Sequence, residues 1–195
     1  RKATGIGEGV KGIRDVVGGT KANTLTGDDQ ANTLTGGASG DTLTGGSGKD
    51  VLLGNKGRDT LTGGPGGDTL TGGEDSDVYK YSLADLIDAA SAAANRDSIV
   101  EESGSANGLL DTIDFSTIPE SDATGKAIKL TFQVGSPEVT GLQANLWLAN
   151  VDQGALFATP AKNIEKILIG AGESNFRFTD TYEWSKILQI EQDAG

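Results

Sequence analysis

Between residues 18 and 80 a large apolar residue returns at every ninth position. Each nine-residue unit opens with glycine, and its apolar eighth position usually stands between two threonines. Because side chains alternate along an extended chain, the apolar residue points to one face of a strand and its two neighbours point to the other. The pattern predicts seven short strands, centred on Leu25, Leu34, Leu43, Leu52, Leu61, Leu70 and Tyr79.

The polar residues of each unit predict the turns between these strands. Positions one to six are rich in glycine, asparagine and aspartate, which favour turns. Two units then form one coil with a strand on each side, and successive coils stack about 4.8 Å apart. Residues 18–80 are therefore expected to fold as an all-β parallel roll, in which the strand of unit n lies beside the strand of unit n+2.

The residues after this region follow other periods. Residues 82–94 predict a helix that caps the open end of the roll, with Ser82 as N-cap and Asp85 in the first turn. Its apolar stripe consists of Leu83, Leu86, Ile87 and Ala90. Further strands are predicted at residues 98–101, 112–116, 128–134, 146–151, 164–169, 176–179 and 187–190. The expected regions are 1–17 (the end of a preceding β cassette), 18–80 (the roll) and 81–195 (the capping helix and a C-terminal β-rich flank).

The composition shows that apolar burial alone does not hold such a roll. Only 35% of the residues are hydrophobic, and there is no cysteine for a disulfide. A single ladder of leucines is too small to offset the roughly 1–2 kcal/mol per residue that ordering the backbone costs. The net charge of -12 argues against a nucleic-acid partner and favours cations. No stretch reaches the length of a transmembrane helix.

The sixth position of the units supplies the candidate cation ligands. It is occupied by Asn23, Asn32, Asp41, Asp50, Asp59, Asp68 and Asp77. Stacking the coils brings these carboxylates together, which is unfavourable in water alone. Carboxylate and carbonyl oxygens are the ligands that calcium prefers, and magnesium demands a more compact shell. Zinc sites are usually built on histidine or cysteine, which this chain lacks.

Units such as GGSGKDVLL (45–53), GNKGRDTLT (54–62) and GGPGGDTLT (63–71) resemble the GGxGxDxUx nonapeptide of RTX (repeats-in-toxin) proteins. The resemblance implies a right-handed parallel β-roll that binds calcium between stacked turns. The ligands it implies are the position-six aspartate, the carbonyls of positions two and four, and position one of the opposing turn. In this chain those positions are Gly36, Gly37, Ser39, Asp41, Gly45, Gly46, Gly48, Asp50, Gly54, Asn55, Gly57, Asp59, Gly63, Gly64, Gly66, Asp68, Gly72, Gly73, Asp75 and Asp77, with Asn23 and Asn32 as weaker candidates.

The first two units depart from this pattern. Asn23 and Asn32 bring no charge, and Lys21 and Gln30 replace glycine at position four, so weak or empty sites are expected there. Seven loops paired n with n+2 give up to five calcium ions. The loop pairs that match the pattern best are 36–41 with 54–59, 45–50 with 63–68, and 54–59 with 72–77.

Three other features have simple structural interpretations beside functional ones. An acidic group after the roll is interpreted as solvated surface, with calcium ligation as the alternative: Asp97, Glu101, Glu102, Asp111 and Asp114. Trp147 and Trp184 are expected to pack, with a carbohydrate platform as the alternative. The Thr-x-Thr columns suit exposed strands, and they also resemble ice-binding surfaces.

These observations favour a calcium-binding structural module. Without histidine or cysteine, and with no distinctive carboxylate pair, the chain offers no catalytic constellation, so an enzyme or processing module is disfavoured. The expected module folds on calcium outside the cell after export and stiffens, spaces or caps a large secreted or surface protein, such as an adhesin. Segments 12–19, 111–116 and 163–172 resemble those that flank RTX rolls, which suggests an internal piece of a longer chain whose flanking domains are its partners. The alternative is a module that binds a glycan or a cell-surface partner.

Overall fold

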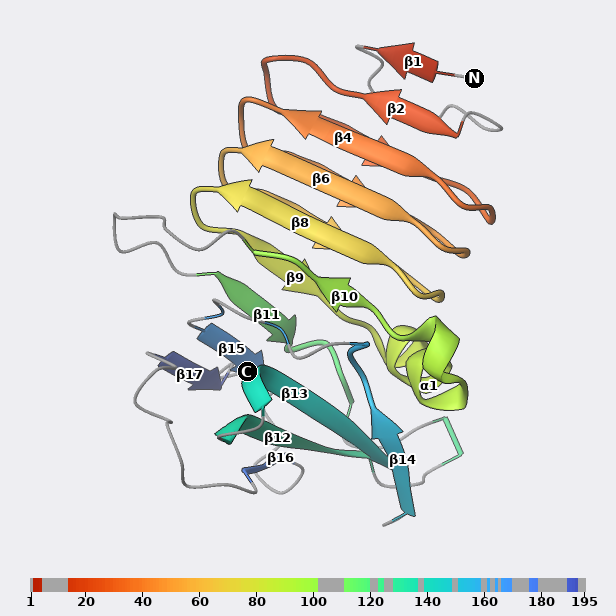
Figure 1. Cartoon of the computed structure of the whole chain (residues 1–195), viewed down its shortest axis with the longest axis vertical. Helices are drawn as coiled ribbons and strands as arrows, with labels where there is room; N and C mark the ends of the chain where they lie inside the picture. Colours follow the sequence, from red (N-terminus) through yellow and green to blue (C-terminus); the bar gives the residue numbers. More distant parts are fainter. Residues whose placement is uncertain are drawn as a thin grey trace.

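The computed structural model describes residues 2–4, 14–101, 111–119, 123–124, 128–136, 139–148, 151–158, 161, 164, 166–169, 176–178 and 189–192. Two sheets of parallel strands face each other and form a stack of coils, with a short helix and a smaller sheet at one end (Figure 1). The chain passes from one sheet to the other and back in each coil. The predicted parallel β-roll is confirmed.

Each sheet extends beyond the nine-residue units. The first sheet contains β1 (Lys2–Thr4), β2 (Asp15–Val17), β4 (Thr33–Gly37), β6 (Val51–Lys56), β8 (Thr69–Glu74) and β10 (Ser98–Ile99), in this order. The second contains β3 (Thr24–Thr26), β5 (Thr42–Thr44), β7 (Thr60–Thr62), β9 (Val78–Lys80), β11 (Thr112–Phe115), β15 (Lys166–Ile169) and β17 (Gln189–Gln192), also in spatial order. The strand of each unit pairs with that of the unit two further on, as predicted.

The core of the roll is a ladder of the eighth-position residues. Leu34 pairs with Leu52, and Leu52 with Leu70, so identical side chains stack directly above one another. All seven eighth-position residues are at most 3% exposed. The ladder continues past the units through four further buried residues, Val16, Ile99, Ile113 and Ile167. The apolar period therefore determines which side of each strand is buried.

We expect Leu61→Ala to lower the free energy of unfolding by about 3 kcal/mol, because it removes a fully buried side chain and leaves a cavity. Leu53→Ala is the matched control, since Leu53 lies at the ninth position, on the half-buried outer face. Chemical denaturation of both variants in saturating calcium measures the difference. Equal losses would contradict the assignment of the eighth position to the core.

Helix α1 (Leu83–Ser91) begins as the sequence predicts. The Ser82 and Asp85 side chains form the reciprocal capping box, with the Ser82 N–H donating to Asp85 Oδ2 at 2.6 Å. The helix ends three residues before residue 94, because Ala92 has an extended backbone, and a 3-10 turn, η1 (Ala93–Asn95), follows.

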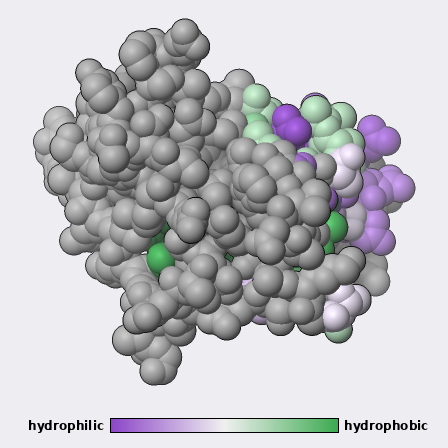
Figure 2. Space-filling model, turned by 90° about the horizontal axis from the view of Figure 1, so that it is seen from below, coloured by the Kyte–Doolittle hydropathy of each residue, from purple (hydrophilic) through white to green (hydrophobic). Residues whose placement is uncertain are grey.

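The prediction that Ile87 belongs to the buried apolar stripe of α1 is wrong. Ile87 is 42% exposed, whereas Leu86 and Ala89 are buried apolar residues of α1. Leu83 packs against the core, and the Ala90 side chain lies outside the described residues. Seen from the α1 end, the coloured surface mixes hydrophilic and hydrophobic residues (Figure 2). Neither α1 nor any other helix of the described residues has the length and apolarity to cross a bilayer.

The smaller sheet consists of β12 (Ile128–Ser136), β13 (Val139–Leu148), β14 (Val151–Ala155) and β16 (Phe176–Phe178). The single strand predicted at 146–151 is wrong, because β13 ends at Leu148 and a separate strand, β14, begins at Val151 and runs antiparallel to it. Trp147 lies in β13, in register with Lys129 of β12. Trp184 falls outside the described residues.

Candidate metal sites

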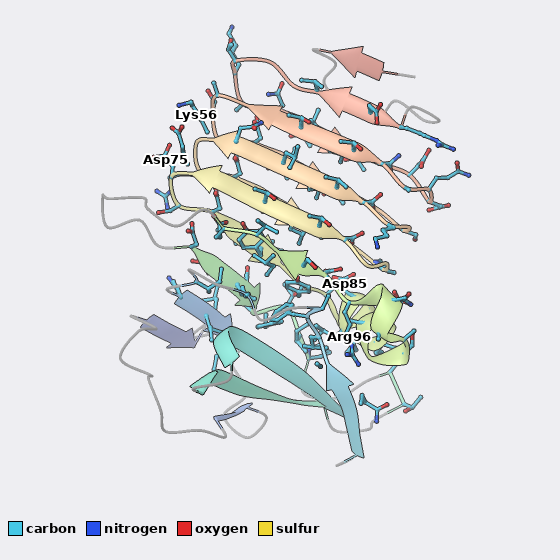
Figure 3. All side chains as sticks on the ribbon, in the orientation of Figure 1. Lys56, Asp75, Asp85 and Arg96 are labelled. Atoms are coloured by element: carbon cyan, nitrogen blue, oxygen red, sulfur yellow. The ribbon has the colours of Figure 1, made fainter. Side chains whose placement is uncertain are left out.

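The turns of the roll lie along two opposite edges. Loops that lead from the first sheet to the second form edge I, and they comprise residues 18–23, 36–41, 54–59 and 72–77. Loops that return to the first sheet form edge II, and they comprise residues 27–32, 45–50 and 63–68. Lys56 and Asp75 mark edge I, whereas Asp85 and Arg96 lie at the α1 end of edge II (Figure 3). Each edge therefore carries its own column of position-six residues.

Within each column, one carboxylate oxygen links neighbouring coils. The backbone N–H of Asp41 donates to Oδ1 of Asp59 at 2.6 Å, and that of Asp59 donates to Oδ1 of Asp77 at 2.8 Å. On edge II the N–H of Asp50 donates in the same way to Asp68 at 2.7 Å. Stacking therefore fixes the orientation of each position-six carboxylate.

The second oxygen of these carboxylates does not link the coils. Among the described residues, Oδ2 has no hydrogen-bond partner and is buried in all five position-six aspartates: Asp41, Asp50, Asp59, Asp68 and Asp77. A buried carboxylate oxygen without a partner is strongly unfavourable, and native proteins pair such atoms or place them against a cation.

Each of these oxygens lies close to the first glycine of its own loop. A Cβ atom at Gly36 would collide with Asp41 Oδ2 and lie only 2.7 Å from the carbonyl oxygen of Gly54, which opens the next loop on edge I. The same arrangement recurs at Gly45, where the carbonyl of Gly63 would lie 2.6 Å away. A carboxylate oxygen of one loop and a carbonyl oxygen of the next therefore both lie close beside the same glycine.

Burial also makes the charged form of these carboxylates unfavourable. Together with the charges of Asp41 and Asp75, it raises the pKa of Asp59 to about 6. Burial likewise raises the pKa of Asp68 and of Asp77 to about 7, and the charges of Asp50 and Asp59 in the preceding coils contribute to the effect. A cation in the loops would remove this penalty.

The backbone of the later loops has the shape that close approach to an ion requires. Positions two and four adopt positive φ in the last four units, at Gly46, Gly48, Asn55, Gly57, Gly64, Gly66, Gly73 and Asp75. Asn55 and Asp75 do so at φ of 80° and 78° although they are not glycine. Loop 36–41 differs, because neither Gly37 nor Ser39 has a positive φ, and serine is unfavourable in that region.

The two asparagine loops satisfy their side chains without an ion. The Asn23 amide donates to Asp41 Oδ1 at 2.9 Å and accepts from the Gly19 N–H at 3.2 Å. Asn32 Oδ1 accepts from the Asp28 N–H at 2.8 Å. The Asn23 and Asn32 side chains therefore have hydrogen-bond partners within the roll, and weak or empty sites in these loops stay a prediction.

The interpretation of the acidic residues after the roll as solvated surface is wrong for those that the structure describes. Asp97, Asp111 and Asp114 are 3%, 6% and 7% exposed, and Glu101 is 9% exposed. Asp114 lies 3.9 Å from the Lys80 ammonium, and Glu102 falls outside the described residues. Ordering of these residues against the last coil removes them from water.

Two of them continue the columns of position-six residues. The N–H of Asp68 donates to Asp97 Oδ1 and that of Asp77 to Asp111 Oδ1, both at 2.8 Å. A sequence signal for this exists, because Asp97-Ser-Ile and Asp111-Thr-Ile repeat the aspartate–x–apolar order of positions six to eight. The nine-residue spacing that makes this order recognisable is absent there.

Comparison with protein families agrees with the oxygen-rich loops. The family model described as RTX calcium-binding nonapeptide repeat (4 copies) matches residues 17–52 and 44–79. A search of curated proteins found no significant match. The matched residues include every position six from Asn23 to Asp77, whereas Asp97, Glu101 and Asp111 lie beyond them.

Proposed function

Because residues 17–79 consist of RTX calcium-binding nonapeptide repeats, which bind Ca²⁺, we propose that the chain is a structural module whose roll becomes stable when calcium enters its loops. The observation that carries the proposal is the row of buried Oδ2 atoms that have no partner within the described part of the chain. All-oxygen loops with flexible geometry suit calcium better than smaller or softer ions.

The proposed ligands come from two successive loops on one edge. The position-six carboxylate of one loop and the position-one carbonyl of the next would hold the ion, as at Asp41 with Gly54, Asp50 with Gly63, and Asp59 with Gly72. Calcium would neutralise the negative charge of the buried carboxylates. The carbonyls of positions two and four are proposed as further ligands where positive φ occurs. The asparagine loops are proposed to bind weakly.

The proposed setting is outside the cell. An acidic, glycine-rich chain with a net charge of -12 is expected to stay open where calcium is scarce, which suits export, and to fold where calcium is plentiful. The folded stack would then stiffen, space or cap a larger secreted or surface protein. We propose no catalytic role, since the repeats are structural and the chain has neither histidine nor cysteine. Glycan binding and ice binding stay predictions from the sequence.

We expect Asp59→Asn to weaken calcium binding by about tenfold or more, because the substitution removes the charge of a carboxylate in the middle of edge I. Asp59 is hydrogen-bonded to Asp41 in the preceding loop and to Asp77 in the following loop. Asp29→Asn is the matched control, since Asp29 is exposed at position three of an asparagine loop. Isothermal titration calorimetry of the full chain measures both. Equal affinities for the two variants would contradict the proposed role of position six.

A further inference from the structure

A second group of carboxylates lies where the repeats end. Asp77 is the last position-six residue, and no further nine-residue unit follows it. Instead, Glu101 and Asp111 approach it from the segments after β10 and before β11. One oxygen from each of these three carboxylates lies within 4.8 Å of the other two, and all three residues are buried or nearly so.

The Glu101 carboxylate stands where a repeat would place a backbone carbonyl. A Cβ atom at Gly72 would collide with Asp77 Oδ2 and lie 2.6 Å from Glu101 Oε1. At Gly54, one coil earlier on the same edge, the second oxygen is the Gly72 carbonyl, also at 2.6 Å. Two oxygens therefore lie close beside Gly72, as in the repeat loops, but one of them comes from the Glu101 side chain and not from a backbone carbonyl.

An independent observation concerns the second carboxylate oxygen of Asp77. Asp77 has no exposed surface, and its Oδ2 has no hydrogen-bond partner within the ranges that the structure describes. This oxygen and Glu101 Oε1 both lie close to the position that a Cβ atom of Gly72 would take. A cation between three carboxylates this close would offset their repulsion and give the buried Asp77 oxygen a partner.

Tyr79 fixes the orientation of Glu101. It is the only eighth-position residue of the seven units that is not leucine. Its hydroxyl accepts from the Gly72 N–H at 2.7 Å and donates to Glu101 Oε1. Tyrosine therefore appears in the last unit, where its hydroxyl can hold a carboxylate that no earlier coil contains.

We propose that Asp77, Glu101 and Asp111 form a calcium site outside the repeat pattern, which binds the residues after the roll to its last turn. The proposal rests on the proposed function for the identity of the ion, but its ligands Glu101 and Asp111 lie outside the matched repeats. Burial, and then the charges of Asp111 and Asp77, raise the pKa of Glu101 to about 8, which agrees with a site that a cation stabilises.

The test compares Glu101→Gln with Glu74→Gln in the full chain. Both variants lose one negative charge, but Glu74 is exposed on edge I and pairs with Lys56 at 2.7 Å. Calorimetric titration with Ca²⁺ should show one site lost, or weakened about tenfold or more, in Glu101→Gln alone. Circular dichroism should show that the calcium-induced β-structure of the roll persists. Identical titrations of the two variants would overturn the proposal.

Tyr79→Phe provides a second variant in case Glu101→Gln does not fold. It keeps the apolar ring in the core and removes only the hydroxyl that holds Glu101. We expect about tenfold weaker binding at one site, as for other residues that orient a metal ligand. If Tyr79→Phe binds calcium as the unaltered chain does, the proposal is wrong. If the unaltered chain binds no calcium at all, the proposed function itself fails, which is a different result.

Discussion

In the presence of a calcium chelator the roll is expected to lose most of its β-structure, and added calcium is expected to restore it. Without the ion, the buried aspartates of both edges retain unpartnered oxygens, and the leucine ladder is too thin to offset this cost. Circular dichroism in the far ultraviolet, recorded during a calcium titration, measures the transition. Magnesium at the same concentration is the control and should restore much less structure.

The pH of this experiment matters because protons can replace the cation. Folding raises the pKa of Asp59 to about 6 and those of Asp68 and Asp77 to about 7, so the folded chain binds protons more tightly than the unfolded chain. This contribution to stability is complete below the unfolded values and is lost as the pH rises through the folded ones. The calcium titration should therefore be carried out at a pH above these folded-state pKa values. A fully ordered roll in chelator at that pH would refute the proposed function.

Gly64→Ala is expected to destabilise the calcium-bound roll by about 4 kcal/mol or more. Gly64 has a φ of +99°, where alanine is strained, and its new Cβ would overlap the carbonyl oxygen of Gly46 in the preceding coil on edge II. Because that oxygen belongs to the backbone, a whole loop must shift to admit the methyl group. Thermal unfolding in saturating calcium measures the loss.

Gly19→Ala is the matched control for this substitution. Gly19 occupies the same second position in the first unit, but a Cβ atom there would meet nothing within 4 Å, and its φ is not positive. We expect its melting temperature to stay close to that of the unaltered chain. Similar losses at both glycines would mean that the close stacking of loops does not limit which residues position two accepts.

The sequence was sufficient to predict the roll because two periods act together in it. Alternation places Leu43 and Leu61 on the inner face, and the nine-residue spacing places them in register. The position-six columns follow from the same spacing. Asp97 and Asp111 were named as possible calcium ligands, but their place in the columns could not be predicted, because they follow Asp68 and Asp77 by 29 and 34 residues, whereas the spacing within the roll is 18.

Other errors have local causes. The run Leu146–Val151 contains no glycine or proline to mark the end of β13, so two strands were read as one. For α1, helical periodicity places Ile87 and Leu86 near one stripe, but only packing against neighbouring elements decides that Leu86 and Ala89 are covered while Ile87 is not. Periodicity indicates an apolar face, and the tertiary structure sets its width.

The hydrogen bonds that join one position-six residue to the next couple the loops energetically. Asp59 receives the Asp41 N–H and gives its own N–H to Asp77, so its geometry depends on both neighbours. A stack linked only between nearest neighbours behaves as a one-dimensional lattice, in which an ordered loop lowers the cost of ordering the next. Calcium binding in one loop would then favour binding in the neighbouring loops of the same edge. The unfolded chain would convert to the folded, stiff roll over a narrow range of calcium concentration.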